Sequence, residues 1–354
     1  MLKITINKTT EPKVKPQAAE LGFGKYFSDH MFMMEYESEK GWVNPRIVPF
    51  ERISIHPAST VLHYGAEIFE GLKAYRNGSG GVQLFRPREN AKRLNLSAER
   101  MCLPTVPEDD FMQILTEFVR LEQDWTPSAP GTSLYLRPFL FGNDEALGVH
   151  PVSNAVFMLI ASPVGSYYKG GLNPVRIMVE CDDVRAVKGG TGYTKCGGNY
   201  AASLRAGKRA ITEGCAQVLW LDGVERKFIE EVGAMNVMFK IAGEVVTPAL
   251  SGSILPGITR SSCIELLRKG GVKVTERPVS FREIVEAHKN GTLEEAWGTG
   301  TAAVISPIGE FSYQGESFVV NGGKIGETAR KLYDTLTGIQ WGTADDRFEW
   351  VYKI

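Results

Sequence analysis

The 354-residue chain has no excess of charge of one sign. Its 40 lysines and arginines are balanced by 41 aspartates and glutamates, which leaves a formal net charge of −1 at pH 7. A protein that binds nucleic acid or a membrane surface through charge needs a basic excess or a run of like charges, and the chain has neither. The ligands that we expect are therefore small, neutral or zwitterionic molecules.

Cysteine is scarce and long apolar runs are missing. The five cysteines are odd in number and form no C-x-x-C pair, so neither a disulfide framework nor a metal site is expected, and a reducing compartment is the simplest interpretation. The most apolar segment, around residues 155–161, is too short to cross a bilayer. The N-terminus lacks the apolar region of a secretion signal. We therefore expect a cytoplasmic protein.

The composition is that of a globular protein, with 43% apolar and 23% charged residues. The length favours two domains. Residues 162–174 (SPVGSYYKGGLNP) contain two prolines and three glycines, which is typical of a connection between domains. We therefore expect a smaller N-terminal α/β domain over 1–161, an interdomain loop over 162–174 and a larger C-terminal domain over 175–354.

Strand-like and helix-like segments alternate in both halves without a strict βαβ rhythm. This arrangement predicts an α/β protein with mixed sheets. Strands are expected at 30–37, 41–50, 82–85, 133–141, 154–161, 175–180 and 217–221, and within 229–241 and 244–250. Helices are expected at 87–101, 109–124, 199–212, 259–268, 281–288 and 325–340.

Lys195 lies between two Gly-Gly pairs, in the segment KGGTGYTKCGGNY, just before a predicted helix of small residues. Such glycines permit unusual backbone angles and the close approach of a flat ligand. A lysine that attacks a carbonyl carbon must be partly neutral, and burial or a nearby cation achieves this by lowering its pKa. The ordinary alternative is a solvated lysine, and the residues alone leave both interpretations open.

Seven segments, in order along the chain, resemble those of branched-chain aminotransferases, which are fold type IV pyridoxal-phosphate enzymes. They are the Lys195 segment together with YGAEIFEGLK at 64–73, LFRP at 84–87, LYLRP at 134–138, EVGAMN at 231–236, ILPGITR at 254–260 and GTGTAA at 298–303. The similarity runs from about residue 27 to the C-terminal helix. It implies a two-domain fold type IV aminotransferase and a homodimer that completes the active site.

The same resemblance implies a reaction and a cofactor. The reaction is transfer of the amino group between L-leucine, L-isoleucine or L-valine and 2-oxoglutarate, which gives branched-chain 2-oxo acids and L-glutamate. The cofactor is pyridoxal 5'-phosphate, held covalently by Lys195, which also transfers the proton during the reaction. Glu231 is expected at the pyridine nitrogen, whereas Glu230 is excluded because adjacent strand residues face opposite ways.

The resemblance also implies the remaining contacts of the cofactor and the substrate. Tyr200 is expected at the O3′ oxygen. The phosphate is expected at the start of a helix, where amides lack partners, and the residues that would bind it are Ile258, Thr259, Thr301 and Arg86. The substrate α-carboxylate is assigned to Tyr64 and to the loop Thr301, Ala302 and Ala303. The aliphatic side chain is expected against Phe27, Phe69, Tyr135 and Tyr167, and Arg137 is the expected partner of the distal carboxylate of glutamate.

Three other interpretations of the sequence compete with this one. Residues 298–303 fit the dinucleotide fingerprint G-x-G-x-x-A of an NAD-dependent oxidoreductase, but that fingerprint requires a helix directly after it, where Pro307 and Gly309 stand. Other fold type IV enzymes, namely D-amino-acid aminotransferase and aminodeoxychorismate lyase, are closer rivals, and a catalytically inactive binding module is a third class. Animal members of the family carry a C-x-x-C redox pair where this chain has Ala303 and Ser306, so thiol-based regulation is not expected there.

Overall fold

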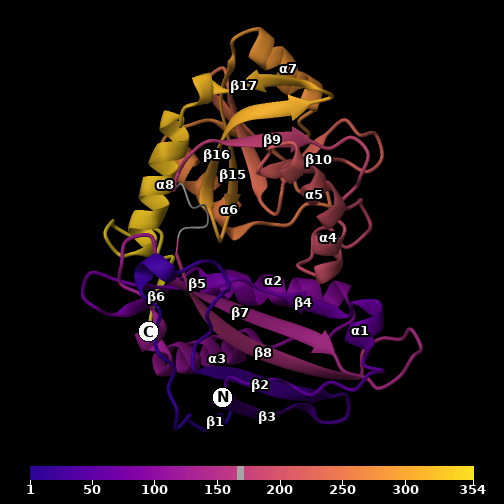
Figure 1. Cartoon of the computed structure of the whole chain (residues 1–354), viewed down its shortest axis with the longest axis vertical. Coiled ribbons are helices and arrows are strands. Elements are labelled where there is room, and N and C mark those ends of the chain that lie inside the picture. Colours follow the sequence, from indigo (N-terminus) through magenta and orange to yellow (C-terminus); the bar gives the residue numbers. More distant parts are fainter. Residues whose placement is uncertain (166–170) are drawn as a thin grey trace. The chain divides into compact units, whose positions relative to one another are not determined.

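The computed structural model describes residues 1–165 and 171–354. Within these residues the chain forms two compact units (Figure 1). The first unit comprises residues 1–165 together with Thr194–Gly197 and Gly338–Ile354, and the second comprises residues 171–193 and 198–337. The short segment that carries Lys195 therefore belongs to the first unit, although the sequence-based division places it in the C-terminal domain.

The first unit contains a nine-stranded sheet in the order β1-β3-β2-β8-β7-β5-β6-β18, with β4 paired to β7. Among the described strands of this sheet, only β1 and β3 pair in parallel. The strands are β1 (Thr5–Ile6), β2 (His30–Glu37), β3 (Gly41–Pro49), β4 (Glu67–Phe69), β5 (Leu72–Arg76), β6 (Val82–Phe85), β7 (Ser133–Gly142), β8 (Asn154–Val164) and β18 (Val351–Lys353). The helical segments are η1 (Ala18–Glu20), α1 (Thr60–Tyr64), α2 (Pro87–Arg100), α3 (Glu108–Leu121) and η2 (Gln123–Trp125).

Alternation along β7 divides the two faces of this sheet. Leu134, Leu136 and Leu140 point into a core that also includes apolar residues of α2 and α3. Because side chains alternate along a strand, Tyr135 and Arg137 lie on the opposite face. One face of the sheet is thus filled by the core, and the other carries the polar and aromatic residues that the sequence singled out.

The second unit contains a nine-stranded mixed sheet in the order β11-β10-β9-β16-β15-β12-β13-β14, with β17 paired to β16. Its strands are β9 (Val175–Val179), β10 (Gln217–Leu221), β11 (Ile229–Val232), β12 (Asn236–Ile241), β13 (Glu244–Pro248), β14 (Val274–Arg277), β15 (Leu293–Gly300), β16 (Val304–Tyr313) and β17 (Glu316–Val319). The helical segments from residue 197 onward are α4 (Gly197–Ala201), α5 (Leu204–Thr212), α6 (Ile258–Lys269), α7 (Phe281–Lys289), η3 (Asn321–Gly323) and α8 (Glu327–Gln340). The prediction of mixed α/β sheets in both halves is confirmed.

Two local predictions were wrong, and one pair of strands was missed. The helix expected over 199–212 is divided into α4 and α5, and between them the Ser203 hydroxyl donates to the Tyr200 carbonyl at 2.6 Å, a side-chain bond that competes with the helix. The loop expected from residue 162 begins later, because β8 continues to Val164, which pairs with Ser133. The strands β15 and β16 were not predicted.

The strands β15 and β16 also test the interpretation of residues 298–303 as a dinucleotide-binding motif. They pair antiparallel from Trp297 and Pro307 to Gly300 and Val304. A strand, a tight turn and a second strand thus occupy the place where a dinucleotide site needs a strand followed by a helix. The oxidoreductase interpretation of the glycine pattern is therefore wrong.

Glu295 caps helix α8 in the second unit. Its side chain is buried, with 5% of the residue exposed, and it accepts hydrogen bonds from the amides of Thr328 and Ala329, both at 2.9 Å. Gly326 makes room for the carboxylate, because a Cβ there would lie 2.0 Å from Glu295 Oε2. A buried acceptor thus fixes where the helix begins.

We predict that Glu295→Ala lowers the free energy of unfolding by about 1–2 kcal/mol, because two amides of the first helical turn lose their acceptor. Urea denaturation measures this change. The control is Glu327→Ala, an exposed acidic residue of the same first turn, which should change the stability by less than about 0.5 kcal/mol. Equal effects of the two substitutions would contradict the capping role.

Candidate active site

The backbone of Lys195 is fixed by two elements of the first unit. Its carbonyl accepts a hydrogen bond from the Phe69 amide at 2.9 Å, and its amide donates to the Ser97 hydroxyl of α2 at 3.0 Å. The amine Nζ lies 4.4 Å from the centroid of the Phe69 ring. Lys195 therefore stands over an aromatic residue that the sequence also predicted to be in the site.

The environment of Lys195 lowers the pKa of its amine to about 8, chiefly through burial. The positive charges of Arg93 and Arg137 act in the same direction, whereas Glu70 and Tyr135 act against it. An ordinary lysine has a pKa of about 10.4 and is almost fully charged at neutral pH. Lys195 thus has a far larger neutral fraction, which nucleophilic attack on a carbonyl requires.

A buried ion pair lies close to this amine. The Glu70 carboxylate is fully buried and accepts two hydrogen bonds from Arg93, from Nε at 2.7 Å and from Nη2 at 2.9 Å. Asn90 Nδ2 donates to the same carboxylate at 2.7 Å. Although burial acts to raise it, the Arg93 guanidinium holds the pKa of Glu70 below its usual range. Glu70 is therefore a fixed negative charge near Lys195.

Sequence reasoning missed this group. Asn90 and Arg93 are three residues apart on α2, so they share a face of the helix, and both are buried there. Apolar residues of the same helix, such as Ala91 and Leu94, belong to the core. The only available signal was a polar pair at helical spacing next to an apolar stripe, which is also what a solvated helix face shows.

Tyr135 and Arg137 lie on the same face of β7 as expected. Arg137 Nη2 donates to the Tyr135 hydroxyl at 3.1 Å, and its guanidinium lies 4.6 Å from the centroid of the Phe69 ring. Phe23 packs edge-on against Tyr135, with the ring centroids 4.8 Å apart. The structure thus brings Lys195, Phe69, Tyr135 and Arg137 together in the first unit.

Other predicted residues of this unit have different surroundings. Phe27 stacks on Phe50, with the ring centroids 5.0 Å apart. Tyr64 is 43% exposed and its hydroxyl donates to the Leu147 carbonyl. The Arg86 guanidinium lies 4.9 Å from the centroid of a ring of Trp350. Tyr167 is outside the described residues.

In the second unit, Glu231 is held in a buried polar cluster. Only 3% of the residue is exposed. Its carboxylate pairs with Arg185 and accepts a hydrogen bond from Asn236 Nδ2 at 3.2 Å. Arg185 also donates to the Ser253 carbonyl at 2.9 Å. The neighbouring Glu230 has another partner, the Ser253 hydroxyl, and burial raises the pKa of its carboxyl.

Asn236 connects Glu231 to the two loops that were predicted to bind phosphate. Asn236 Nδ2 donates to the Leu255 carbonyl at 2.9 Å, and a Cβ on Gly257 would lie 1.9 Å from Asn236 Oδ1. Asn236 also pairs with Thr299, near the end of β15. The start of α6 at Ile258 and Thr259, and the turn that holds Thr301, Ala302 and Ala303, therefore lie near one asparagine.

The geometry of these two loops suits an anion. Helix α6 begins at Ile258 after Gly257, so its first amides have no partner within the helix and carry the positive end of the helix dipole. The turn between β15 and β16 is tight, and Val304 has a φ of 62°, which is unusual for a β-branched residue. Backbone amides at a helix start are a common way to bind phosphate.

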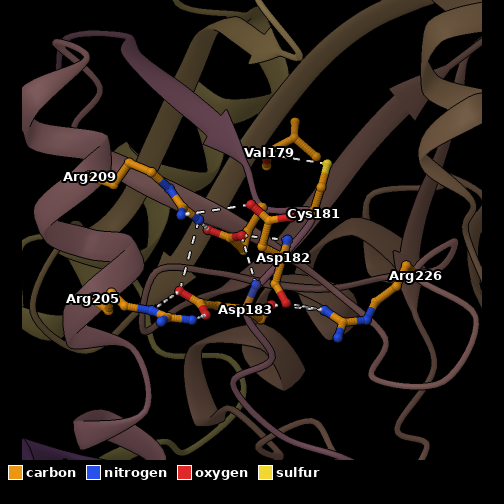
Figure 2. A network of polar contacts seen from close by, with 8 residues as sticks. Val179, Cys181, Asp182, Asp183, Arg205, Arg209 and Arg226 are labelled. Atoms are coloured by element: carbon orange, nitrogen blue, oxygen red, sulfur yellow. Dashed lines mark hydrogen bonds and ion pairs between the residues drawn. The ribbon is translucent and has the colours of Figure 1, made fainter.

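A network of ion pairs supports the segment that leads to Arg185 (Figure 2). The amides of Asp182 and Asp183 donate to the buried Glu180 carboxylate at 2.7 and 2.9 Å. Arg205 of α5 pairs with Asp183, and Arg226 donates to the carbonyls of Asp182 and Asp183 at 3.0 and 3.2 Å. Because the network satisfies its charges internally, we interpret it as structural. It ties this segment to α5, the helix that follows Tyr200.

Two wider observations concern residues 1–165 and 171–354. No three or more histidine, cysteine, aspartate or glutamate side chains gather there in a way that could hold a metal ion. No helix in that part of the chain is long and apolar enough to cross a membrane.

We predict that removal of either partner of the Glu70–Arg93 pair destabilises the protein. Glu70→Ala and Arg93→Ala should each lower the free energy of unfolding by about 3–5 kcal/mol, because each leaves a buried charge without its partner. The double substitution should cost less than the sum of the two, which a double-mutant cycle in urea measures.

The control for this cycle is the exposed pair Arg88–Asp109, in which Arg88 belongs to the same helix. Its side chains are 54% and 87% exposed, so its removal should cost at most about 1 kcal/mol. If the variants of the buried pair were no less stable than those of the exposed pair, the buried pair would not have the role described.

Comparisons with known proteins place this geometry in a family. The family model described as amino-transferase class IV matches residues 67–311. Branched-chain-amino-acid aminotransferase 2 of Bacillus subtilis (strain 168) is 52% identical over 351 residues, which cover 99% of this chain and 97% of the relative. Branched-chain-amino-acid transaminase 1 of the same organism is 51% identical over 348 residues, which cover 98% of both chains.

Solved structures agree with these relatives. The crystal structure of the branched-chain amino acid aminotransferase of Escherichia coli is similar with a TM-score of 0.76 and 28% identity, and the match covers 91% of this chain and 98% of that one. A branched-chain aminotransferase from Thermoproteus uzoniensis, solved with norvaline, has a TM-score of 0.76 at 25% identity, over 92% of this chain and 99% of that one. The chain therefore belongs to the class IV aminotransferases and, among them, to the branched-chain amino acid aminotransferases.

Proposed function

We propose that this enzyme transfers the amino group between L-leucine, L-isoleucine or L-valine and 2-oxoglutarate, with pyridoxal 5'-phosphate as its cofactor. The observation that carries the proposal is a half-buried lysine whose amine has a pKa of about 8, set beside Phe69, Tyr135 and Arg137. The relatives named above are called branched-chain aminotransferases, which favours this activity over that of a D-amino-acid aminotransferase or aminodeoxychorismate lyase.

The residues present fit the cofactor. When bound, pyridoxal phosphate supplies an aldehyde that takes up the amino group and a ring that withdraws electrons from the reacting carbon. Lys195 is a suitable amine for the covalent link to that aldehyde. Glu231 is a buried carboxylate with a fixed orientation, and α6 begins with amides that have no partner within the helix.

Each of these residues has a distinct task in the proposed reaction. Lys195 would form the covalent link to the cofactor's aldehyde and would move the proton at the substrate Cα. Glu231 would keep the ring nitrogen protonated, and Arg185 and Asn236 keep its carboxylate in place. The Tyr200 phenol would be the partner of the O3′ oxygen. Ile258, Thr259 and Thr301 would bind the phosphate through their amides and hydroxyls.

Two arginines are candidates for the contact with the phosphate. The resemblance assigns Arg86, whose guanidinium lies over Trp350. Arg93 is the arginine whose charge acts most strongly on Lys195, and it is already held in place by Glu70. We therefore propose Arg93 as a second candidate for this contact and keep Arg86 as a prediction from the sequence.

The substrate contacts follow from the chemistry of leucine and glutamate. Aromatic rings at Phe69 and Tyr135 offer an apolar surface to an aliphatic side chain, and Arg137 offers a cation to the distal carboxylate of 2-oxoglutarate. Tyr64 and the loop of Thr301, Ala302 and Ala303 are proposed to receive the α-carboxylate. Phe27 and Tyr167 stay predictions for the aliphatic pocket.

We also propose that the enzyme is a cytoplasmic homodimer. Apolar side chains near Tyr64 are unusually exposed in the first unit, with Leu62 at 57%, Leu147 at 67% and Val149 at 83%. Exposed apolar groups of this kind often mark an interface with another chain. They support the dimer that the family resemblance implies.

The test of the proposed function is the location of the cofactor. Borohydride reduction of the holoenzyme followed by peptide mapping should find the pyridoxyl group on Lys195, and Lys195→Ala should abolish transamination of L-leucine with 2-oxoglutarate. Lys188→Ala is the matched control, because this exposed lysine lies in the same glycine-rich segment, and it should keep its activity. An adduct on another lysine, or no adduct, would overturn the assignment.

Glu231 provides a second test, with its neighbour as the control. Glu231→Gln should retain the cofactor but lower kcat by about 10²-fold or more, because an amide cannot hold the proton on the ring nitrogen. Glu230→Gln should lower kcat far less, since Glu230 is buried beside Ser253 instead. Steady-state kinetics and cofactor absorbance measure both effects. Near-normal turnover of Glu231→Gln would exclude the proposed role.

A further inference from the structure

The proposed reaction makes conflicting demands on Arg137. A guanidinium suits the distal carboxylate of 2-oxoglutarate but disfavours the aliphatic side chain of leucine, because a buried charge without a partner is costly. The guanidinium is partly buried against the rings of Phe69 and Tyr135. Its Nε is buried and has no hydrogen-bond partner among the described residues. A nearby negative charge that moderates Arg137 would resolve the conflict.

Glu67 provides such a charge, because its position on β4 places its side chain close to Arg137. It precedes Phe69 by two residues, so both side chains lie on the same face of the strand. The Arg137 guanidinium lies over the Phe69 ring on that face, 4.6 Å from its centroid. Carboxylate and guanidinium therefore flank one aromatic residue, which the Lys195 amine also contacts at 4.4 Å from the same centroid.

The Glu67 carboxylate cannot easily move from this position. Its Oε1 accepts a hydrogen bond from the amide of Gly197, two residues after Lys195. A Cβ at position 197 would lie 2.0 Å from that oxygen, so the absence of a side chain there is what admits the carboxylate. Glu67 is thus fixed to the segment that carries the reactive lysine.

Electrostatics link Glu67 with Arg137. Burial raises the pKa of Glu67 above its ordinary value, whereas the Gly197 amide and the Arg137 charge act to lower it. The interaction is mutual, so the Glu67 carboxylate offsets part of the positive potential of Arg137. Sequence reasoning did not find Glu67, because one acidic residue on a short strand carries no signal of its own.

We propose that Glu67 is a specificity-determining residue of this site. Its charge offsets that of Arg137, so that one pocket accepts both a methyl-rich side chain and a carboxylate. The inference rests on the proposed function, since it assigns the two kinds of substrate to the pocket of Phe69, Tyr135 and Arg137. Without Glu67, the pocket would favour dicarboxylic substrates over aliphatic ones.

The experiment removes the charge and keeps the hydrogen bond. In Glu67→Gln the amide oxygen can still accept from Gly197, so the Lys195 segment stays in place. We expect KM for L-glutamate to fall and KM for L-leucine to rise, each by up to about fivefold, with little change in kcat. Calorimetric titration with two unreactive probes, glutarate and 4-methylpentanoate, should show tighter binding of the first and weaker binding of the second.

Glu67→Ala separates this effect from a structural one. It removes both the charge and the acceptor, so it should lower kcat for both substrates by disturbing the Lys195 segment. If Glu67→Gln raised both KM values together, or left their ratio unchanged, the inference would be wrong while the proposed function stood. If the wild-type enzyme did not convert L-leucine at all, the proposed function would fail and this inference with it.

Discussion

The burial of one amine is the constraint on which the chemistry of this protein depends. Lys195 is held by the Phe69 amide and the Ser97 hydroxyl, and its amine lies over an aromatic ring rather than in water. Burial lowers the pKa of this amine, the Arg93 charge acts in the same direction, and the Glu70 carboxylate opposes them. Arg93 keeps Glu70 ionised and in place. The pKa of the nitrogen that we propose as the reactive one is thus set by charges that are held in place.

The second unit holds its own buried acid, Glu231, with one charged partner, Arg185, and one neutral partner, Asn236. Asn236 touches the Glu231 carboxylate, the segment before α6 and the end of β15. One short side chain therefore sets the spacing between an acid and two backbone loops. Sites held by hydrogen bonds to rigid strands in this way need little reorganisation when a ligand binds. The network around Asp183 extends the same rigidity to Arg185 (Figure 2).

Local patterns predicted much of the fold but not all of it. Alternation predicted β2 at its observed bounds, and helical spacing predicted α2 to within one residue. The strands β15 and β16 were missed because their glycines and Pro307 are typical of loops. They become strands through pairing with each other and with β12, β9 and β17, which the local sequence does not show. Helix α8 begins where Glu295, a distant residue, caps it.

The sequence predicted only some residues of the candidate site, because the others depend on contacts between segments that are distant in the chain. Motifs led to Lys195, Phe69, Tyr135 and Arg137, which the structure brings together. The partners that tune them, Glu70 and Arg93, stayed hidden because a buried ion pair and a solvated one have the same sequence pattern. The 23-residue separation of Glu70 and Arg93 does not reveal that the two side chains meet, because the contact forms only when α2 packs on the sheet. Glu67 is a further case, since its role arises from Gly197, 130 residues away.

The most direct test of this account is the pH dependence of cofactor capture by the cofactor-free protein. The rate at which pyridoxal phosphate becomes linked to Lys195 should increase with pH as the amine loses its proton. We predict a midpoint near the pKa of about 8 that the surroundings of Lys195 impose. A midpoint near 10.5, the value of an unperturbed lysine, would show that the amine is not tuned by its surroundings and would contradict the account.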